Sequence, residues 1–245
     1  MRTLITSLAV ALLIPTFVQF AAAGDPDQAG AVVEKAIEAA GGRKNLEKFT
    51  AMTWKETGTY YGMGEGLPYT SKGAFSYPDK SFMEIEGFFS MGLNGDKGWV
   101  KMGEDVTDMP EDQLKGQMEA QYASWAATLL PLKGEGFALK SLEDADLNGK
   151  PAAVVQVSHK GHGDVKLYFD KKTGRLAKSA FTAYDSEQAK DADYETWYDG
   201  YKEMEGAKLA CKIVMNRDGK KFVVGEITEV KPAKPEAIAK MFEKP

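Results

Sequence analysis

Short extended segments joined by tight turns make up most of this chain. They recur at intervals of roughly 8–14 residues from Ala51 almost to the C-terminus. Hairpin chemistry separates several of them, as in Asn94-Gly95, Asn148-Gly149 and Asp218-Gly219. Connections this short join only antiparallel neighbours, because parallel strands need long crossovers. The pattern therefore predicts an antiparallel sheet and argues against Rossmann and TIM-barrel architectures.

About eleven strands are expected, and an open sheet of that size must curl. The predicted strands are residues 51–60, 68–77, 81–89, 98–102, 137–142, 152–159, 165–170, 176–184, 194–201, 207–216 and 222–230. Because no Ser/Gly-rich linker interrupts the series, residues 24–245 are expected to form a single domain. The predicted fold class is α+β, mainly β, with helices covering the curled sheet.

Helices are predicted at 27–40, 43–48, 108–129 and 235–242. The first ends at Gly41-Gly42, which favours a left-handed cap, and the third begins with Asp108 as its N-cap and an early proline. Large apolar side chains recur along the third helix at helical spacing. This stripe consists of Leu114, Met118, Tyr122, Trp125 and Leu129.

Residues 1–23 read as a removable secretory signal. Arg2 provides a positive start, residues 4–20 are mainly apolar, and Ala21-Ala22-Ala23 forms an A-x-A cleavage site. Cys211 is the single cysteine and lies far from that site, so lipidation of the mature end is not expected. The sequence therefore predicts an exported, soluble, periplasmic protein that contains no disulfide.

The charge and the polar motifs favour no catalytic or nucleic-acid role. Lys and Arg number 31 against 36 Asp and Glu, which gives a net charge of -5, whereas nucleic-acid binders usually carry a basic excess. His159 and His162 supply two imidazoles, too few for a metal site, and read as a polar hairpin tip. We therefore predict no catalytic residues, no bound metal and no cofactor, and keep a hydrolase using these histidines as an alternative.

Large apolar side chains are numerous in this sequence and need an explanation. Tryptophans at 54, 99, 125 and 197 are spread over the predicted strands and the third helix, together with eleven methionines. Methionine adapts to irregular apolar partners. Most of these side chains belong in a core between sheet and helix, but a concave face too wide for its helices to fill would accept an acyl chain. Each buried methylene contributes about 0.8 kcal/mol to such binding.

In the order of its predicted helices, strands and short motifs, the chain resembles the LolA-like superfamily of periplasmic lipoprotein carriers and outer-membrane lipoprotein-sorting proteins. The resemblance runs through nearly the whole mature chain, in short motifs. These are Ala39–Gly42, then Leu46, Phe49 and Gly58, then Tyr77-Pro78 before Glu84, Asn94–Trp99, Tyr168–Gly174 and Met241–Pro245.

That resemblance implies an eleven-stranded half-barrel whose helices cover an apolar cavity. The lid would be the helix over 114–129, and the side chains facing the cavity would be Trp54, Trp99, Met118, Tyr122, Trp125 and Leu129. The lipoprotein carrier holds its lid with a strand arginine. Here Arg43 reads as helical, Arg217 as a turn residue and Arg175 as a strand start, which favours generic lipid binding over lipoprotein traffic.

The resulting hypothesis is a non-enzymatic carrier whose partners are lipids, acyl chains, lipidated proteins or proteins at the membrane surface. The alternative from a different class is an envelope interaction or sensing module on the same fold, with a filled interior. A cavity beneath residues 114–129 would favour the carrier.

Overall fold

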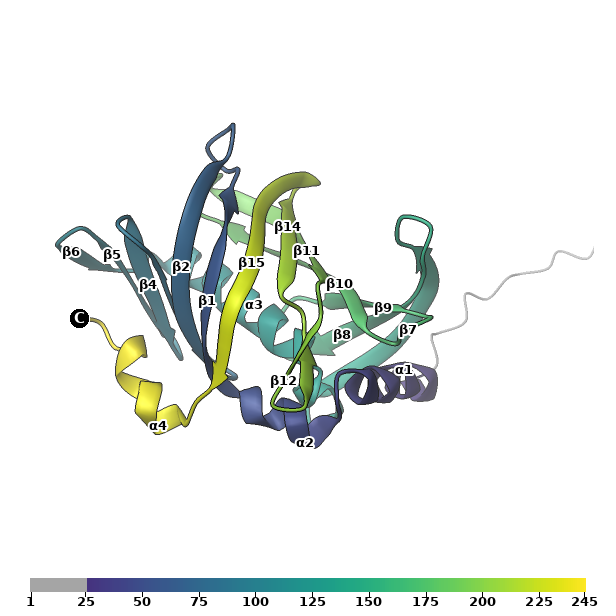
Figure 1. Ribbon diagram of the computed structural model, residues 1–245. Coiled ribbons are helices and arrows are strands. Elements are labelled where there is room, and N and C mark those ends of the chain that lie inside the picture. Colours follow the sequence, from purple (N-terminus) through teal and green to yellow (C-terminus); the bar gives the residue numbers. More distant parts are fainter. Residues whose placement is uncertain (1–25) are drawn as a thin grey trace, which may run out of the picture.

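A single antiparallel sheet dominates the structure. The computed structural model describes residues 26–245, so the predicted signal peptide lies outside the described residues. Thirteen strands form one sheet in the order β6-β5-β4-β3-β2-β1-β15-β14-β11-β10-β9-β8-β7, and β12 and β13 form a separate two-stranded ribbon. The sheet curls without closing, so that β6 and β7 remain its edges (Figure 1).

The strands are β1 (Ala51–Tyr60), β2 (Leu67–Ser76), β3 (Lys80–Ile85), β4 (Phe89–Asn94), β5 (Lys97–Met102), β6 (Asp105–Asp108), β7 (Phe137–Asp146), β8 (Pro151–His159), β9 (Val165–Asp170), β10 (Leu176–Asp185), β11 (Lys190–Asp199), β12 (Lys202–Met204), β13 (Ala207–Leu209), β14 (Lys212–Arg217) and β15 (Lys220–Pro232). Every paired neighbour is antiparallel, as predicted. The α+β half-barrel prediction is confirmed.

The helices cover one end of the curl and part of its concave face. They are α1 (Pro26–Ala39), α2 (Arg43–Leu46), η1 (Glu47–Phe49), α3 (Glu111–Ala127), η2 (Leu130–Lys133), α4 (Pro235–Ile238) and η3 (Ala239–Phe242). Helix α3 lies inside the curl, α1 and α2 run along its lower end, and α4 lies outside it (Figure 1). Among residues 26–245, no helix is both long and apolar enough to cross a membrane.

Two apolar clusters hold these layers together. The larger one joins α1 and α3 to strands β8 and β9, with Val33, Ala126, Val157 and Leu167 nearly inaccessible to solvent. The smaller one lies on the opposite face of the sheet, where Phe242 packs over Ala51 and Ala74. The concave face therefore receives α1 and α3, and the convex face receives the C-terminal segment.

The sheet has two more strands than the prediction of about eleven. The predicted strand over 81–89 is β3 followed by a turn, in which Gly87 adopts a φ of 72°, and β4 begins only at Phe89. Strand β6 was missed as well. Asp108, predicted as the N-cap of the long helix, is the last residue of β6, and its carboxylate binds Lys244 at 2.8 Å.

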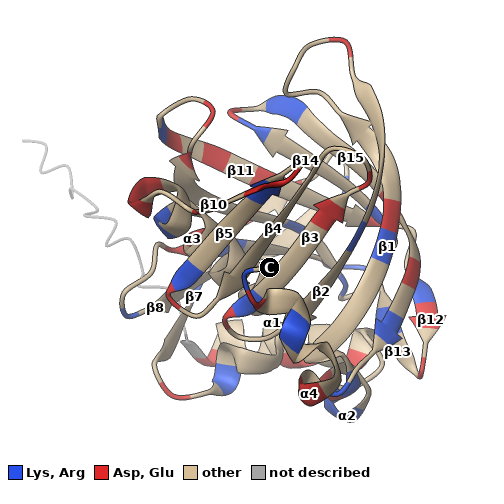
Figure 2. Cartoon of the chain, turned by 90° about the vertical axis from the view of Figure 1, so that its left-hand side faces the viewer, with Lys and Arg blue, Asp and Glu red and all other residues tan. Residues whose placement is uncertain are grey.

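Charged residues of both signs are interspersed over the outer strands and helices (Figure 2). The convex face shows the pattern in detail, because Lys55 binds Glu229 at 3.5 Å and Lys72 binds Glu84 at 3.1 Å. Glu84 thus has an ion-pair partner on the neighbouring strand β2. Such exposed pairs contribute little to stability. Because charged pairs cover the convex face, an apolar ligand site is expected on the concave face.

Candidate functional site

An apolar cavity of about 250 Å³ lies between the concave face of the sheet and the helices at its lower end. Its wall from the helical side comes from α1, α2, η1 and the C-terminal end of α3. Its wall from the sheet comes from β1, β2, β10, β11, β14 and β15. The lining residues are Ala36, Ala40, Leu46, Phe49, Met52, Phe75, Tyr77, Ser124, Ala127, Thr128, Leu129, Leu130, Arg175, Leu176, Tyr198, Tyr201, Lys208, Leu209, Ala210, Ile213, Ile227 and Val230.

Small side chains on the helices leave this space open. Helix α3 presents Ser124 and Ala127 to the cavity, followed by its C-cap Thr128, and α1 presents Ala36, followed by Ala40 just beyond its end. The bulky residues of α3 point elsewhere, toward β7 and the β8–β9 turn. Because the helices pack through other faces, the short side chains cannot fill the gap between them and the sheet.

Strand register brings the large side chains of the sheet wall together. Met52 of β1 lies opposite Phe75 of β2, and Ile213 of β14 lies opposite Tyr198 of β11. A register shift after Lys55 keeps both Ile227 and Val230 of β15 on the cavity side. Without that bulge, one of the two would point to the convex face.

The tyrosine hydroxyls around the cavity are already hydrogen-bonded within the protein. The hydroxyl of Tyr77 lies 2.7 Å from Ser124 Oγ, that of Tyr198 lies 2.9 Å from Ser179 Oγ, and that of Tyr201 donates to the Leu176 carbonyl at 2.5 Å. Burial raises the pKa of all three tyrosines, so they remain neutral. They therefore present ring faces rather than unsatisfied polar atoms to the cavity, which suits an apolar guest.

Of the six side chains predicted to face a ligand, Leu129 lines this cavity. It does so from a left-handed conformation, with φ of 68°, because α3 ends at Ala127 rather than at 129. Trp54 borders the cavity without lining it. Its indole stacks on Phe75 at 6.3 Å and covers Gly73.

The other four predicted residues lie away from the cavity wall. Tyr122 stacks on His162 at 4.2 Å, Trp125 packs edge-on against Phe137 at 5.3 Å, and Met118 is half-buried elsewhere on α3. Trp99 lies on the convex face, where its Nε1 donates to the Phe242 carbonyl at 3.1 Å. A role for any of the six in lipid contact remains a prediction.

Arg217 differs from the prediction, whereas Arg43 agrees with it. Arg217, predicted in a turn, is the last residue of β14, and its guanidinium donates to Asp185 and Glu187 at 2.7 Å. These hydrogen bonds hold the tip of the β10–β11 hairpin against β14. Arg43 lies in α2, as predicted, and donates to the Leu130 carbonyl at 3.1 Å.

A buried carboxyl group lies on the same concave face, next to the cavity. Glu56 of β1 is 7% exposed, pairs in register with cavity-lining Ile227, and accepts a hydrogen bond from the Tyr69 hydroxyl. Burial raises the pKa of Glu56, and the Tyr69 hydrogen bond opposes that shift. Among residues 26–245, no cation forms an ion pair with it, so its negative charge is disfavoured in the folded protein.

Replacing Glu56 with glutamine is expected to stabilise the protein by about 1 kcal/mol at pH 7, because an amide keeps the hydrogen bond without a buried charge. A folded pKa above the unfolded one means that wild-type stability falls as pH rises through that interval. The advantage of E56Q should therefore shrink toward pH 4. Urea unfolding of both proteins at pH 4 and 7 measures this, with Tyr69→Phe as the destabilised control. A less stable E56Q at pH 7 would show that the folded state needs the anion.

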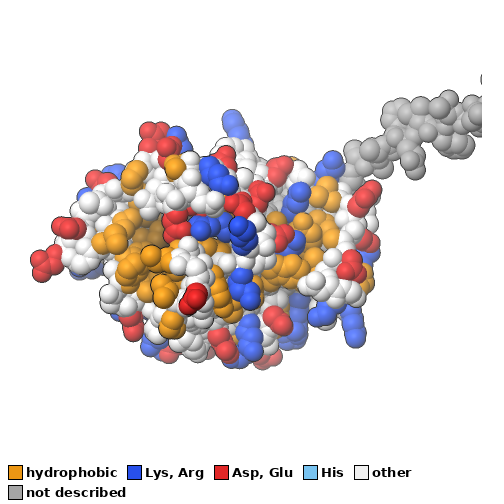
Figure 3. Space-filling view, turned by 90° about the horizontal axis from the view of Figure 1, so that it is seen from above, with side chains coloured by type: hydrophobic (Ala, Val, Ile, Leu, Met, Phe, Trp, Pro, Cys, Tyr) orange, Lys and Arg blue, Asp and Glu red, His pale blue; other side chains and the backbone are white. Residues whose placement is uncertain are grey.

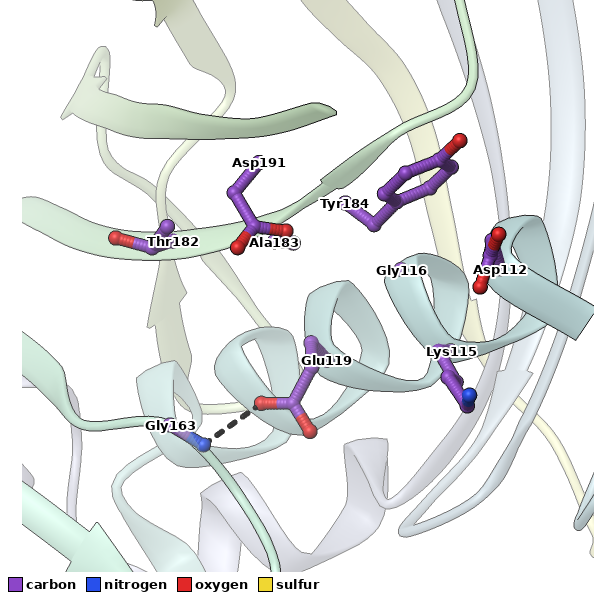
Figure 4. Close-up of a pocket in the computed structure, with 9 residues that line it drawn as sticks. All are labelled: Asp112, Lys115, Gly116, Glu119, Gly163, Thr182, Ala183, Tyr184 and Asp191. Carbon is purple, nitrogen blue, oxygen red and sulfur yellow. Dashed lines mark hydrogen bonds between the residues drawn. The ribbon is translucent and has the colours of Figure 1, made fainter. Parts of the chain in front are cut away.

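A second depression, of about 320 Å³, lies between α3 and strands β10 and β11 and is more polar (Figure 4). Glu119 is its central acid. One carboxylate oxygen accepts the Gly163 N–H at 2.9 Å, and the other lies 2.9 Å from His162 Nδ1. These contacts tie the turn between β8 and β9 to α3. Its lining residues are Asp112, Lys115, Gly116, Glu119, Gly163, Thr182, Ala183, Tyr184 and Asp191.

A hydrolase that forms a covalent intermediate would need a nucleophilic side chain hydrogen-bonded to one of these histidines. His159 Nδ1 is buried and has no partner, and His162 pairs with a carboxylate. Thr182, which lines the depression together with Tyr184, donates its hydroxyl to Asp193 at 2.8 Å. Across residues 26–245, no Ser, Thr or Cys side chain hydrogen-bonds to either histidine, so the geometry does not assemble a nucleophile–base pair.

No protein-family model and no curated protein matches the chain. Solved structures do match it. A LolA superfamily protein from Nitrosomonas europaea superposes with a TM-score of 0.57 at 15% identity, covering 88% of this chain and 97% of that one. A DUF1329 family protein from Desulfovibrio piger gives 0.58 at 12% identity, covering 89% and 98%.

A third match is a domain from Vibrio parahaemolyticus described as an outer membrane lipoprotein-sorting protein. It superposes with a TM-score of 0.51 at 14% identity, covering 86% of this chain and all of that domain. At these identities the likeness concerns the arrangement of the backbone. The curled sheet of this chain, with α1 and α3 on its concave side, therefore has a LolA-like fold.

Proposed function

We propose that this protein binds a single acyl chain in the 250 Å³ cavity and carries it as a soluble, exported, non-enzymatic protein. The observation that supports the proposal is an apolar cavity whose surrounding tyrosine hydroxyls are already paired inside the protein. Such a site gains affinity by removing hydrocarbon from water and requires no reactive group.

The size of the cavity suits one chain. An engineered apolar cavity of about 150 Å³ stays dry and takes up benzene. Pockets for larger ligands begin at roughly 300 Å³. At about 250 Å³, this space holds a single hydrocarbon segment, whereas a lipoprotein anchor with several chains would need the sheet and the helices to separate. The proposed cargo is therefore a one-chain amphiphile, and lipoprotein traffic is the less favoured reading.

The proposed location is the periplasm. It rests on the signal-like residues 1–23, with their basic start and A-x-A site. A periplasmic carrier of this type would move chains between membranes or hold them at a membrane surface. The LolA superfamily likeness agrees with that setting at the level of the fold.

Native mass spectrometry of the freshly purified mature protein tests the proposal. In the freshly purified protein we expect adducts with the mass of one fatty acid or one one-chain phospholipid. If the purified protein is empty, we expect an adduct of one oleate after incubation with oleate. Protein that stays empty under both conditions would contradict it. The double variant H159Q/H162Q should keep its adducts in the same experiment. If the protein were instead a hydrolase using these histidines, this variant would lose hydrolytic activity in an ester-hydrolysis assay.

Exposed apolar side chains support a second candidate, a protein-interaction module. Met63 and Leu67 of the β1–β2 hairpin are 71% and 51% exposed, and Phe88 and Met102 are 58% and 56% exposed. Hydrophobic side chains gather across this end of the molecule, with charged ones around them (Figure 3). Replacing Phe88 and Met102 with serine should abolish partner capture and leave acyl binding intact if both functions exist.

A further inference from the structure

We propose that Arg175 and Lys208 form an anion site at the edge of the acyl cavity, which binds the negatively charged head of a one-chain amphiphile. The inference rests on the proposed function and specifies the ligand class, namely a carboxylate or phosphate attached to a hydrocarbon chain. The observation behind it is that these are the two cationic residues among the residues that line the cavity, in an otherwise largely apolar wall.

The position of Arg175 is fixed by its neighbours. It follows the turn between β9 and β10, in which Asp170 accepts the Thr173 N–H at 2.7 Å. Its guanidinium lies over the ring of Tyr201, 5.1 Å from the centroid, and the hydroxyl of Tyr201 donates to the neighbouring Leu176 carbonyl. Among residues 26–245 the Arg175 guanidinium makes no hydrogen bond to the protein, so its N–H groups can donate to a ligand.

Lys208 is also held through its backbone. Its N–H donates to the Ala40 carbonyl at 2.8 Å, which joins β13 to the end of α1 beside the cavity. Glu203 lies opposite Lys208 in the β12–β13 ribbon, but in the part of the chain that the structure describes no ion pair joins Lys208 or Arg175 to a carboxylate. At the same end of the molecule, by contrast, Lys133 binds Glu34 at 2.6 Å.

Electrostatics favours an anionic head at this edge. Burial and Tyr198 raise the pKa of Tyr201, Arg175 opposes this shift, and Asp199 adds to it; one oxygen of Asp199 accepts the Gly200 N–H at 2.7 Å. The edge of an arginine guanidinium can donate two parallel hydrogen bonds to a carboxylate or phosphate. Such charged hydrogen bonds are stronger than hydrogen bonds between neutral groups. The cavity would thus hold the chain and the two cations would hold the head.

Binding of oleate and of oleyl alcohol, which share one hydrocarbon chain, tests the site. At pH 8 we expect the wild-type protein to bind oleate about tenfold more tightly than the alcohol. The variant R175Q/K208Q should lose that preference and keep its affinity for the alcohol. The double variant K140Q/K166Q, at exposed positions on β7 and β9, removes the same two positive charges and should behave like wild type.

Three outcomes decide between the proposals. Equal wild-type affinity for the two ligands, or a preference that survives in R175Q/K208Q, would overturn the anion site and leave the acyl cavity standing. Binding of neither ligand would overturn the proposed function and the anion site together. A third ligand, oleoyl lysophosphatidate, distinguishes the two head groups. If the double variant loses more affinity for oleate, the site fits a carboxylate; if it loses more affinity for lysophosphatidate, the site fits a phosphate.

Discussion

Replacing Ala127 with phenylalanine is expected to weaken acyl-chain binding about a hundredfold without unfolding the protein. Ala127 is one of the small residues of α3 that line the cavity, so its short side chain leaves space for a guest. A phenyl ring there would occupy the space of about four methylenes of the guest, at about 0.8 kcal/mol each, or about 3 kcal/mol in all. Since the ring enters a space that is already apolar, the fold itself should tolerate it.

Displacement of a fluorescent fatty acid measures this effect, and thermal unfolding checks the fold. Ala237→Phe is the matched control, because Ala237 is exposed on α4 and does not line the cavity. The control should bind like wild type. Unchanged affinity in a folded A127F protein would show that the guest binds elsewhere.

Gly116→Ala is expected to destabilise the protein by about 2–3 kcal/mol, although alanine is the better helix former by about 1 kcal/mol. Gly116 is the point where α3 touches β10, and a Cβ atom there would overlap the backbone carbonyl of Tyr184 (Figure 4). Because that obstacle is backbone in a strand, it cannot rotate away. Helix α3 would have to shift, and the helical wall of the cavity would shift with it.

Gly30→Ala is the matched control for this prediction. Gly30 lies in α1, and a Cβ atom there would meet nothing within 4 Å. We expect this change to stabilise the protein by about 0.5–1 kcal/mol through helix propensity and the unfolded state. Chemical denaturation of both variants gives the comparison. Stabilisation by both substitutions would show that α3 does not dock closely against the Tyr184 carbonyl of β10.

Much of the fold could be predicted from local chemistry. Turns such as Asn148-Gly149 mark the ends of strands, and strand β9 falls at the predicted residues 165–170. The missed strands have a physical reason. The segment over 81–89 alternates and ends in two phenylalanines, so nothing in its periodicity reveals that Gly87 reverses the chain there. Short edge strands such as β6 depend on pairing with β5 rather than on their own pattern.

The position of the cavity was harder to predict because large apolar side chains do not mark it. Large side chains such as Tyr122 and Trp125 fill space, and they do so against Phe137 and the histidine turn. A cavity forms where a helix presents small side chains to a sheet, as Ala36 and Ala127 do. Alanines at such positions look like ordinary helix residues until the docking of the helices is known. The sequence therefore predicts an apolar interior but does not identify its empty part.

Photo-crosslinking with a diazirine-labelled fatty acid tests the central claim most directly. After irradiation and digestion, mass spectrometry locates the labelled residues in the saturated complex. We expect labels on both walls of the cavity, at Met52 and Phe75 from the sheet and at Leu129 from the helical side. Labels confined to exposed residues such as Phe88 and Met102, with the cavity wall unlabelled, would contradict it.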